Sequence, residues 1–428
     1  MRQSQHVAAE TVFTYAAPGL KFGPGASAEL AHDLAALGCR RVLLVTDPGV
    51  LATGAPERIV DLLRAGGVDV EVYADVHVEP TDRSLQDAVE HARVLSRVDG
   101  VVAVGGGSSI DTAKAVNLML CAPGELMDYV NAPIGNGQAP PTDLLPLVAV
   151  PTTTGTGAES TTVCVLDVLA RKVKTGISHA RLRPTLAVID PELTMSQPAG
   201  VTASAGMDIL CHALESYTAR PYATFERKRA DERVPYCGAN PISDMWAERA
   251  MSLLAQSFRR AVTDGGDVGA RTDMALAATF AGLGFGNAGV HVPHANAYPV
   301  AGQVREFRAE GYPGDGPLVP HGMSVAMTAP ESFRFTYSAN PDRHVRAAEL
   351  LAPGVRCDDA VDLLPTALTE LMRDIGLPSG LAELGFGADD VPALVEGSLA
   401  QPRLLSISPR PVEADDLATI FSRSMQNW

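Results

Sequence analysis

The sequence predicts two domains: an α/β domain with a parallel sheet over residues 1–194, and an all-helical domain over residues 195–428. Three observations lead to this division. The chain has 428 residues, more than one hydrophobic core usually supports. Its first half alternates short apolar runs with amphipathic stretches, which is typical of a parallel sheet covered by helices on both faces. Its second half carries almost only the periodicity of helices.

The elements of the first half follow in order along the chain. Strands are expected at residues 41–46, 68–73, 101–104 and 145–150, and helices at residues 55–65 and 84–96. Residues 161–177 contain β-branched side chains around a turn, which indicates a hairpin that interrupts the alternation. A last apolar run, from Pro184 to Pro191, closes the domain.

In the second half, long amphipathic stretches predict helices at residues 245–262, 270–283 and 361–375. One segment, Thr218 to Ser243, differs, because it holds several prolines and the basic run Arg227-Lys228-Arg229. It is either a solvated surface loop or a lid over a functional cleft, since long loops in compact domains often carry function. The sequence leaves both interpretations open.

Composition narrows the class of partner. The formal net charge of −16 argues against nucleic acid and against an anionic membrane surface, because both are negatively charged. No apolar run approaches the ~18 residues of a membrane span. The six cysteines show no C-x-x-C spacing, which is typical of a reduced protein. The N-terminal residues contain no apolar signal core. We therefore expect a protein of the bacterial cytoplasm.

Asp208 and His212 are four residues apart in a predicted helix, so their side chains share one helix face. Two further histidines, His294 and His321, each follow a proline closely. One carboxylate and three imidazoles form a complete ligand set for a divalent metal such as iron(II) or zinc(II). Each residue taken alone is more often an ordinary buried polar group.

Two other residues near this set are not expected to be ligands. Cys211 is adjacent to His212, but neighbouring residues on a helix point about 100° apart, which favours a place in the core. His291 lies three residues before His294 and is interpreted as a core residue or as a partner of a ligand.

A glycine-rich turn, Gly105-Gly106-Gly107-Ser108, follows the apolar run at residues 101–104 and precedes a predicted helix. Free backbone N–H groups at such a helix start suit a pyrophosphate, although a tight structural turn has the same appearance. Residues 148–159 repeat the pattern, with Thr152, Thr153 and Thr156 after a second apolar strand. Two such strand ends that converge on one ligand predict a dinucleotide site.

Asp47 ends the first predicted strand, where an acidic residue can accept both ribose hydroxyls and repel a 2′-phosphate, which favours NAD over NADP. In the sequence Thr46-Asp47-Pro48 the same carboxylate can equally cap a helix. Lys174 in the predicted hairpin is a candidate partner of a ribose or phosphate, or a solvated lysine. Asp111 and Lys114 are expected to pair on their helix.

These motifs, in this order, resemble those of the iron-containing (group III) alcohol dehydrogenases. Within that family the sequence is similar to the hydroxyacid–oxoacid transhydrogenases, in segments that include Val78 to Asp82, Asp128 to Gly135, Gly238 to Asp244 and Phe285 to His291. The resemblance implies a Rossmann-like NAD-binding domain followed by a helical domain, the dehydroquinate synthase-like architecture. It assigns Asp208, His212, His294 and His321 as metal ligands, with iron(II) favoured over zinc(II).

One departure concerns the proton path. Alcohol dehydrogenases of this family carry a second histidine four residues after the third ligand, where this chain has Tyr298, and Ala295-Asn296 replaces their small Gly-Met pair. The resemblance therefore predicts an altered pocket, with Tyr298 in a catalytic role.

The predicted activity is hydride transfer through bound NAD from a hydroxyacid, such as 4-hydroxybutyrate, to an oxoacid, such as 2-oxoglutarate. The alternatives are an NAD-dependent alcohol or 4-hydroxybutyrate dehydrogenase that releases NADH, and a non-catalytic nucleotide- or metal-binding protein. The expected partners are small hydroxyacids, oxoacids or alcohols, and a homo-oligomer is expected. Arg220, Arg305 and Arg308 are equal candidates for binding a substrate carboxylate.

Overall fold

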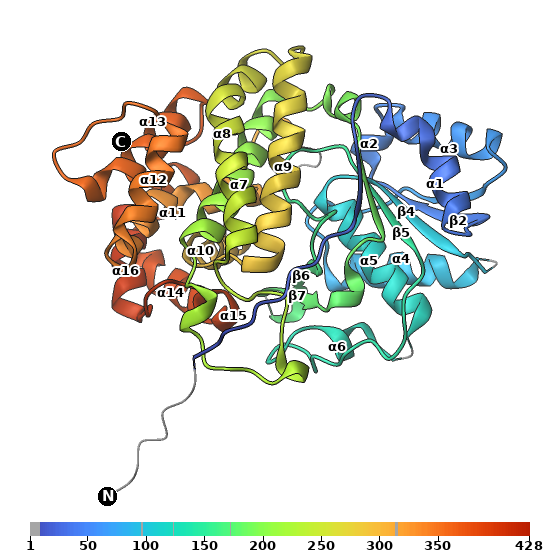
Figure 1. The fold of residues 1–428 in the computed structure, drawn as a ribbon, viewed down its shortest axis with the longest axis horizontal. Helices are drawn as coiled ribbons and strands as arrows, with labels where there is room; N and C mark the ends of the chain where they lie inside the picture. Colours follow the sequence, from blue (N-terminus) through green and yellow to red (C-terminus); the bar gives the residue numbers. More distant parts are fainter. Residues whose placement is uncertain (1–8, 96, 123, 172, 313–315) are drawn as a thin grey trace, which may run out of the picture.

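The structure is a computed structural model that describes residues 9–95, 97–122, 124–171, 173–312 and 316–428. Figure 1 shows an α/β half, coloured blue to green, beside a helical half, coloured light green to red. The predicted fold class is confirmed. The boundary at residue 194 stays a prediction.

The α/β half is built on a six-stranded sheet with the order β1-β8-β5-β4-β2-β3, in which every neighbouring pair is parallel. The strands are β1 (Gly19–Phe22), β2 (Arg41–Val45), β3 (Asp69–Tyr73), β4 (Gly100–Gly105), β5 (Leu147–Pro151) and β8 (Leu186–Ile189). β4 and β5 are buried along their whole length, which explains their continuous apolar runs. The edge strand β1 was not predicted, because it is short and half-exposed and has no such run.

Helices cover both faces of this sheet. They are α1 (Leu30–Ala36), α2 (Pro48–Leu51), α3 (Ala55–Ala65), α4 (Asp82–Val94), α5 (Gly107–Cys121) and α6 (Leu126–Tyr129). Alternate residues of β2 and β4 divide between two apolar clusters, one with α1 and α3 and the other with α4 and α5. The helices predicted at residues 55–65 and 84–96 are thereby confirmed as α3 and α4.

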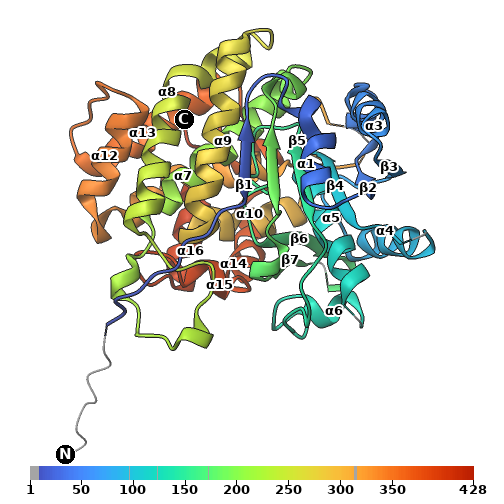
Figure 2. The same ribbon diagram turned by 45° about the vertical axis from the view of Figure 1, so that its right-hand side comes forward.

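The predicted hairpin is also present. β6 (Val163–Val168) and β7 (Val173–Ser178) pair antiparallel and form a separate two-stranded sheet. Figures 1 and 2 both show it between the large sheet and the helical half.

The helical half begins at α7 and runs to the C-terminus. Its helices are α7 (Ala199–Thr218), α8 (Pro241–Thr263), α9 (Val268–Ala288), α10 (Val292–Gly302), α11 (His321–Thr336), α12 (Pro341–Leu351), α13 (Leu363–Asp374), α14 (Val391–Leu399), α15 (Pro402–Leu405) and α16 (Ala414–Arg423). α8, α9 and α13 match the predicted helices. The central helix α7 packs against α8, α9 and α11, and its second half is buried on every side. Polar residues there must therefore find partners inside the protein.

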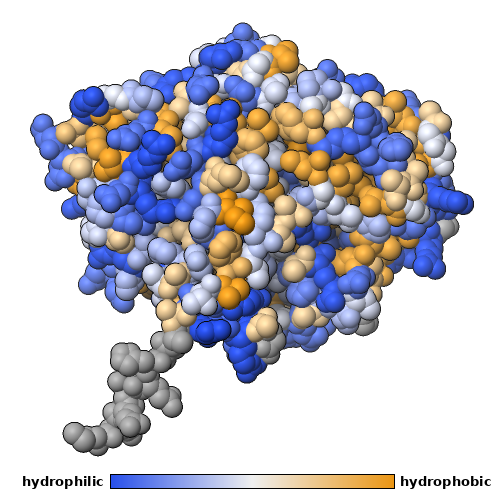
Figure 3. All heavy atoms as spheres, viewed as in Figure 1, coloured by the Kyte–Doolittle hydropathy of each residue, from blue (hydrophilic) through white to orange (hydrophobic). Residues whose placement is uncertain are grey.

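Figure 3 shows hydrophilic and hydrophobic residues interspersed over one face of the molecule. In the described parts of the chain, no single helix is long and apolar enough to cross a membrane. Only α9 and α10 taken together pass that test, and they are bent by 104°.

The packing of α7 against α8 depends on Gly206. A Cβ atom at this position would lie 2.2 Å from the ring of the buried Phe258. We expect Gly206→Ala to lower the free energy of unfolding by about 1–3 kcal/mol, because the close-packed core must move to admit the methyl group. Denaturant unfolding of the purified protein measures the loss. Gly302→Ala is the control, since nothing lies within 4 Å of its added Cβ. Equal midpoints for the two variants would contradict this account of the packing.

Candidate metal and nucleotide site

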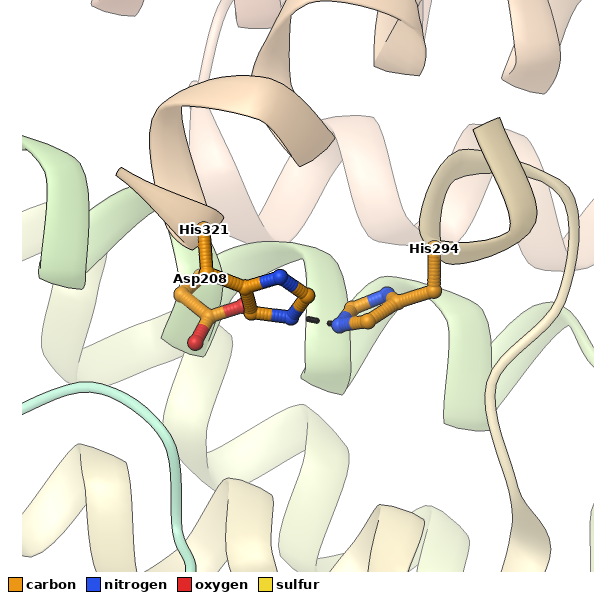
Figure 4. A group of neighbouring side chains, drawn as sticks. All are labelled: Asp208, His294 and His321. Atoms are coloured by element: carbon orange, nitrogen blue, oxygen red, sulfur yellow. Dashed lines mark ion pairs between the residues drawn. The ribbon is translucent and has the colours of Figure 1, made fainter. Parts of the chain in front are cut away.

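The structure brings together the four residues that the sequence singled out as metal ligands. Asp208 and His212 lie on α7, His294 on α10 and His321 at the start of α11. The Nε2 atoms of His212, His294 and His321 are 3.6, 3.4 and 3.8 Å from Oδ1 of Asp208. Figure 4 shows the carboxylate of Asp208 and the rings of His294 and His321 turned toward one another.

The close approach of α11 to α7 depends on Gly322. A Cβ atom here would lie 2.1 Å from the backbone oxygen of Ser204 and 2.8 Å from Cβ of Asp208, so only glycine fits. Ser204 also accepts a 3.0 Å hydrogen bond from the backbone N–H of Met323. His321 is thereby placed beside Asp208, which gives a physical reason for the Pro320-His321-Gly322 sequence.

The donor set fits a bound cation. Asp208 Oδ1 and His294 Nε2 are buried and have no hydrogen-bond partner among the described residues. Such orphaned atoms are costly in a protein interior unless something absent from the protein chain binds them. Ligand atoms of Asp208, His294 and His321 all lie within 4.8 Å of one another, close enough to share one ion. Carboxylate and imidazole donors suit iron(II) or zinc(II).

Glu215 is a functional residue that the sequence reasoning missed. Its Oε1 lies 2.5 Å from Nδ1 of His294, and its Oε2 accepts a 2.5 Å hydrogen bond from the backbone N–H of His291. A carboxylate on the far nitrogen of a ligand histidine fixes the ring orientation and makes the ligand nitrogen more basic. The sequence contained an indication of this role, because Glu215 follows Asp208 by two helical turns and therefore lies on the same face of the helix.

Burial and charge oppose each other in this cluster. Burial alone would lower the pKa of His294, but Glu215 and Asp208 outweigh it and raise that pKa to about 9. Burial would likewise raise the pKa of Asp208, but the three imidazoles hold it well below its usual range. Burial lowers the pKa of His212 to about 3 despite the Asp208 carboxylate. Asp208 is therefore an anion and His212 a neutral imidazole at neutral pH.

Aromatic packing holds the ring of His212. It stacks on Phe285 with centroids 3.8 Å apart and on His294 with centroids 4.5 Å apart. Cys211 is buried in the helical core, as predicted. The ring of His291 contacts Thr218 Oγ1 at 3.1 Å, so His291 acts near the site through its backbone.

A first cavity, about 1260 Å³ with the open solvent at its mouth, lies between the ends of β4 and β5 and the start of α11. Its lining includes Gly106, Gly107, Ser108, Thr152, Thr153 and Thr156. A Cβ atom at Gly107 would lie 2.6 Å from Thr156, so this glycine keeps a cradle open at the N-terminus of α5. Thr152 Oγ1 and Gln197 Nε2 are buried there without a partner among the described residues. These features fit a pyrophosphate and its ribose groups.

Two of the predicted cofactor residues lie elsewhere. Gly105 is packed beneath the loop, where its added Cβ would lie 2.3 Å from Ser109. Lys174 lines neither this cavity nor the one beside the histidines. It is buried and bonded to Glu79 at 2.7 Å and Asp167 at 2.9 Å. The structure therefore does not bring Lys174 to the nucleotide cleft.

Asp47 caps a helix, as one of its two predicted roles requires, and its contact with the ribose stays a prediction. Its Oδ1 accepts a 3.0 Å hydrogen bond from Val50 and caps α2, while Oδ2 accepts one of 3.0 Å from Ser109. The residue also lines the first cavity. Asp111 and Lys114 pair at 3.2 Å, as expected.

A second cavity of about 750 Å³, again with its open mouth, lies on the other side of the ligand set. Its lining includes Asp208, His212, His294, Tyr298, His321 and, unforeseen from the sequence, Glu79, Tyr236 and Arg403. Asp208 and His321 line both cavities. Burial raises the pKa of Tyr298 to about 12, so its hydroxyl stays protonated at neutral pH. The two cavities meet at the candidate metal site, an arrangement suited to transfer between two bound molecules.

The segment Thr218 to Ser243 is partly a surface loop and partly a cavity wall. It contains two short 3-10 helices, Tyr222–Thr224 and Ala230–Glu232, and it packs on the N-terminal residues through Glu10 and Arg233. Tyr236 near its end is buried and lines the second cavity. Most of the segment is a surface loop, and the interpretation of it as a lid stays a prediction.

Comparisons with known proteins agree with this geometry. Residues 18–191 match the family model described as iron-containing alcohol dehydrogenase, and residues 232–425 match that described as Fe-containing alcohol dehydrogenase family, C-terminal. The chain is similar to the mitochondrial hydroxyacid-oxoacid transhydrogenase of Rattus norvegicus, with 44% identity over 97% of this chain and 90% of that protein. The resemblance stated from the sequence is confirmed.

Solved structures show the same fold. A 1,3-propanediol oxidoreductase matches with a TM-score of 0.84 and 32% identity, over 97% of this chain and all of that one. The sulfoacetaldehyde reductase of Bifidobacterium kashiwanohense, in complex with NAD+, matches with a TM-score of 0.79 and 28% identity, over 96% and 98% of the two chains.

One prediction needs correction. The expected bacterial cytoplasmic location is contradicted, because similar proteins such as those of rat and human are named mitochondrial enzymes. Net charge and cysteine spacing did not reveal this, since they describe the folded protein and not the compartment that holds it. Residues 1–8, on which part of the prediction rested, lie outside the described residues.

The matched family models cover most of the chain, and the transhydrogenase similarity extends over nearly all of it. The nucleotide-type cleft is lined by residues of both matched regions, and His294 and His321 lie in the second region, whereas Asp208 and His212 lie between the two. The chain therefore belongs to the iron-containing alcohol dehydrogenase family and is an oxidoreductase.

Proposed function

We propose that this enzyme transfers a hydride between a hydroxyacid and an oxoacid through NAD that stays bound. The observation that carries the proposal is the junction of the two cavities at Asp208 and His321. A nucleotide in the first cavity and a small substrate in the second would both reach the ligand set. The transhydrogenase name of similar proteins supports the choice of substrates.

Asp208, His212, His294 and His321 would hold the cation, with iron(II) as the proposed metal and zinc(II) as the alternative. A cation there supplies Lewis-acid polarisation of the substrate oxygen. Glu215 orients His294 through the 2.5 Å contact, and Phe285 holds the ring of His212. These contacts arrange the ligands before any substrate binds.

Gly106, Gly107 and Ser108 would bind the pyrophosphate with backbone N–H groups at the start of α5, and Thr152, Thr153 and Thr156 would add hydroxyl groups. Asp47 would accept the adenosine ribose hydroxyls. NAD, when bound, accepts a hydride and returns it. Retention of NAD is consistent with a cleft formed by both halves of the chain.

The cycle has two half-reactions that balance. The hydroxyacid loses a hydride from its carbinol carbon and a proton from its hydroxyl group, and leaves as an aldehyde or ketone acid. The oxoacid then takes up a hydride at its carbonyl carbon and a proton at its oxygen. Tyr298 lines the second cavity with a protonated hydroxyl, and we propose that it donates a hydrogen bond to the substrate.

We also propose that the enzyme forms a homo-oligomer.

Glu215 provides the first test. The two carboxylate oxygens of Glu215 accept hydrogen bonds from His294 Nδ1–H and His291 N–H. In Glu215→Gln, an NH2 group, which can only donate, takes the place of one of these oxygens. One donor therefore loses its acceptor, and we expect metal affinity to fall about 10- to 100-fold. Competition with a chelator measures the affinity. Glu248→Gln is the control, because this carboxylate bonds to Tyr217 at 2.9 Å and lines neither cavity. Unchanged metal affinity in Glu215→Gln would show that Glu215 does not support the ligand set.

Asp47 tests the choice of cofactor. We expect the wild type to bind NAD far more tightly than NADP, because the carboxylate repels a 2′-phosphate. Asp47→Asn should narrow this difference about tenfold or more, since asparagine keeps the helix cap but removes the charge. Titration of both cofactors measures it. Asp267→Asn is the matched control, because Asp267 also caps a helix, with a 2.9 Å bond from Ala270, but lies outside both cavities. Equal wild-type affinities for NAD and NADP would remove Asp47 from the site.

The last test separates a transhydrogenase from a dehydrogenase. With 4-hydroxybutyrate deuterated at its carbinol carbon and 2-oxoglutarate, we expect deuterated 2-hydroxyglutarate to form without added NAD. The label should be retained because hydride does not exchange with water. Mass spectrometry of the product measures it.

An absolute requirement for added NAD, with NADH absorbance that rises with the donor alone, would instead identify a dehydrogenase that releases its cofactor. Gly107→Val is the control, because the larger side chain fills the cradle beside Thr156. It should abolish label transfer and leave metal content intact.

A further inference from the structure

The second cavity has three chemically different kinds of lining residue. The metal-type ligands and the cationic Arg403 both line it. Apolar side chains of one buried cluster also line it, among them Val163, Phe285 and Leu404. A molecule that fills this cavity would therefore carry a polar reacting group, a short carbon chain and a group that an arginine binds.

Arg403 is the uncompensated charge of this cavity. The other ionisable groups in its lining, apart from histidines and tyrosines, are the acids Glu79, Asp111 and Asp208. Glu79 pairs with Lys174 at 2.7 Å, and Asp111 pairs with Lys114 at 3.2 Å. Asp208 belongs to the ligand set. Within the described ranges, no carboxylate forms an ion pair with Arg403.

The position of Arg403 is set by packing. It lies on the short helix α15, which Figures 1 and 2 both show beside the β6–β7 hairpin. Gln401, just before this helix, donates a 3.3 Å hydrogen bond to the backbone oxygen of Lys174 in that hairpin. The guanidinium carbon of Arg403 lies 4.8 Å from the ring centroid of Tyr236. Tyr236 is also a hydrogen-bond partner of this guanidinium group. The contact holds the guanidinium in place, and the group has five N–H donors, more than one tyrosine hydroxyl can accept.

The candidates from the sequence lie elsewhere. Arg220 stacks on Phe225 at 4.2 Å and bonds to Thr224, and Arg305 forms a 2.8 Å ion pair with Asp390. Arg308 donates a 3.0 Å hydrogen bond to the backbone oxygen of Tyr312. None of the three lines the cavity beside the histidines.

We propose that Arg403 binds the carboxylate of the hydroxyacid and oxoacid substrates and so makes this oxidoreductase selective for acids over simple alcohols. The inference rests on the proposed function and names the group that recognises its substrates. A guanidinium fork matches a carboxylate with two parallel hydrogen bonds, which a neutral alcohol cannot form. The local cation also offsets the net charge of −16, which otherwise repels anionic substrates.

The test compares two donors of equal length, 4-hydroxybutyrate and 1,4-butanediol, on the holoenzyme with both NAD and 2-oxoglutarate added, so that the hydride has an acceptor whether or not NADH is released. Arg403→Gln should lower kcat/KM for the acid about 10- to 100-fold, mainly through KM, and change that for the diol less than about threefold. Arg403→Lys should recover part of the loss, because lysine keeps the charge but not the fork. Arg305→Gln is the matched control and should leave both substrates unchanged. Equal losses for acid and diol, or no loss for either, would overturn the inference.

Equilibrium binding of glutarate separates this inference from the proposed function, because glutarate carries the carboxylates but cannot react. Calorimetry on the holoenzyme should show binding that weakens at least tenfold in Arg403→Gln, with metal content and bound NAD unchanged. A wild type that binds glutarate through Arg403 but transfers no hydride between acids without added NAD would defeat the transhydrogenase proposal alone. A wild type that binds no glutarate, or a variant that binds it equally well, would defeat the assignment of Arg403.

Discussion

The site depends on the contact between α7 and α11 at Gly322. The backbone of Ser204 and the Cβ of Asp208 occupy the space that any side chain at position 322 would need. Since His321 is the first residue of α11, this contact determines how closely its ring approaches the Asp208 carboxylate. α10 completes the group, and Glu215 on α7 connects it to His294. Three helices thus meet where a single ion can be shared.

Charge balance explains why so many ionisable groups can be buried around this point. Lys114 is fully buried against Asp111, and Lys174 is buried between Glu79 and Asp167. Removing one member of such a pair is costly, because it leaves an uncompensated charge in a poorly solvated place. After this pairing, the Arg403 guanidinium has no carboxylate partner among the described residues, and the Asp208 carboxylate faces only the three histidines of the candidate ligand set. These are the positions where the proposed metal and the proposed substrate carboxylate would bind.

The two halves of the chain divide the chemistry. The carboxyl ends of the parallel strands β4 and β5 supply the glycine and threonine loops of the first cavity, as the topology of an open α/β sheet favours. The helical half supplies the four candidate ligands. Tyr236 comes from the segment between α7 and α8 and Arg403 from the short helix α15, and the short hairpin contributes Val163 and Val165. The substrate cavity is thus built from parts that lie far apart in the sequence.

The sequence by itself determined the fold class, the strands β2 to β5, the hairpin and the candidate ligands, because apolar periodicity and local motifs depend on residues near one another in the chain. It missed β1, because its four residues pair with β8, a strand that lies near the other end of the domain's sequence. Helical spacing alone places Glu215 on the same face of α7 as Asp208, but it could not show that Glu215 contacts His294 on α10. Only the tertiary structure placed Lys174 outside the nucleotide cleft and Arg403 inside the substrate cavity. Their positions follow from packing between remote segments, for which no local pattern exists.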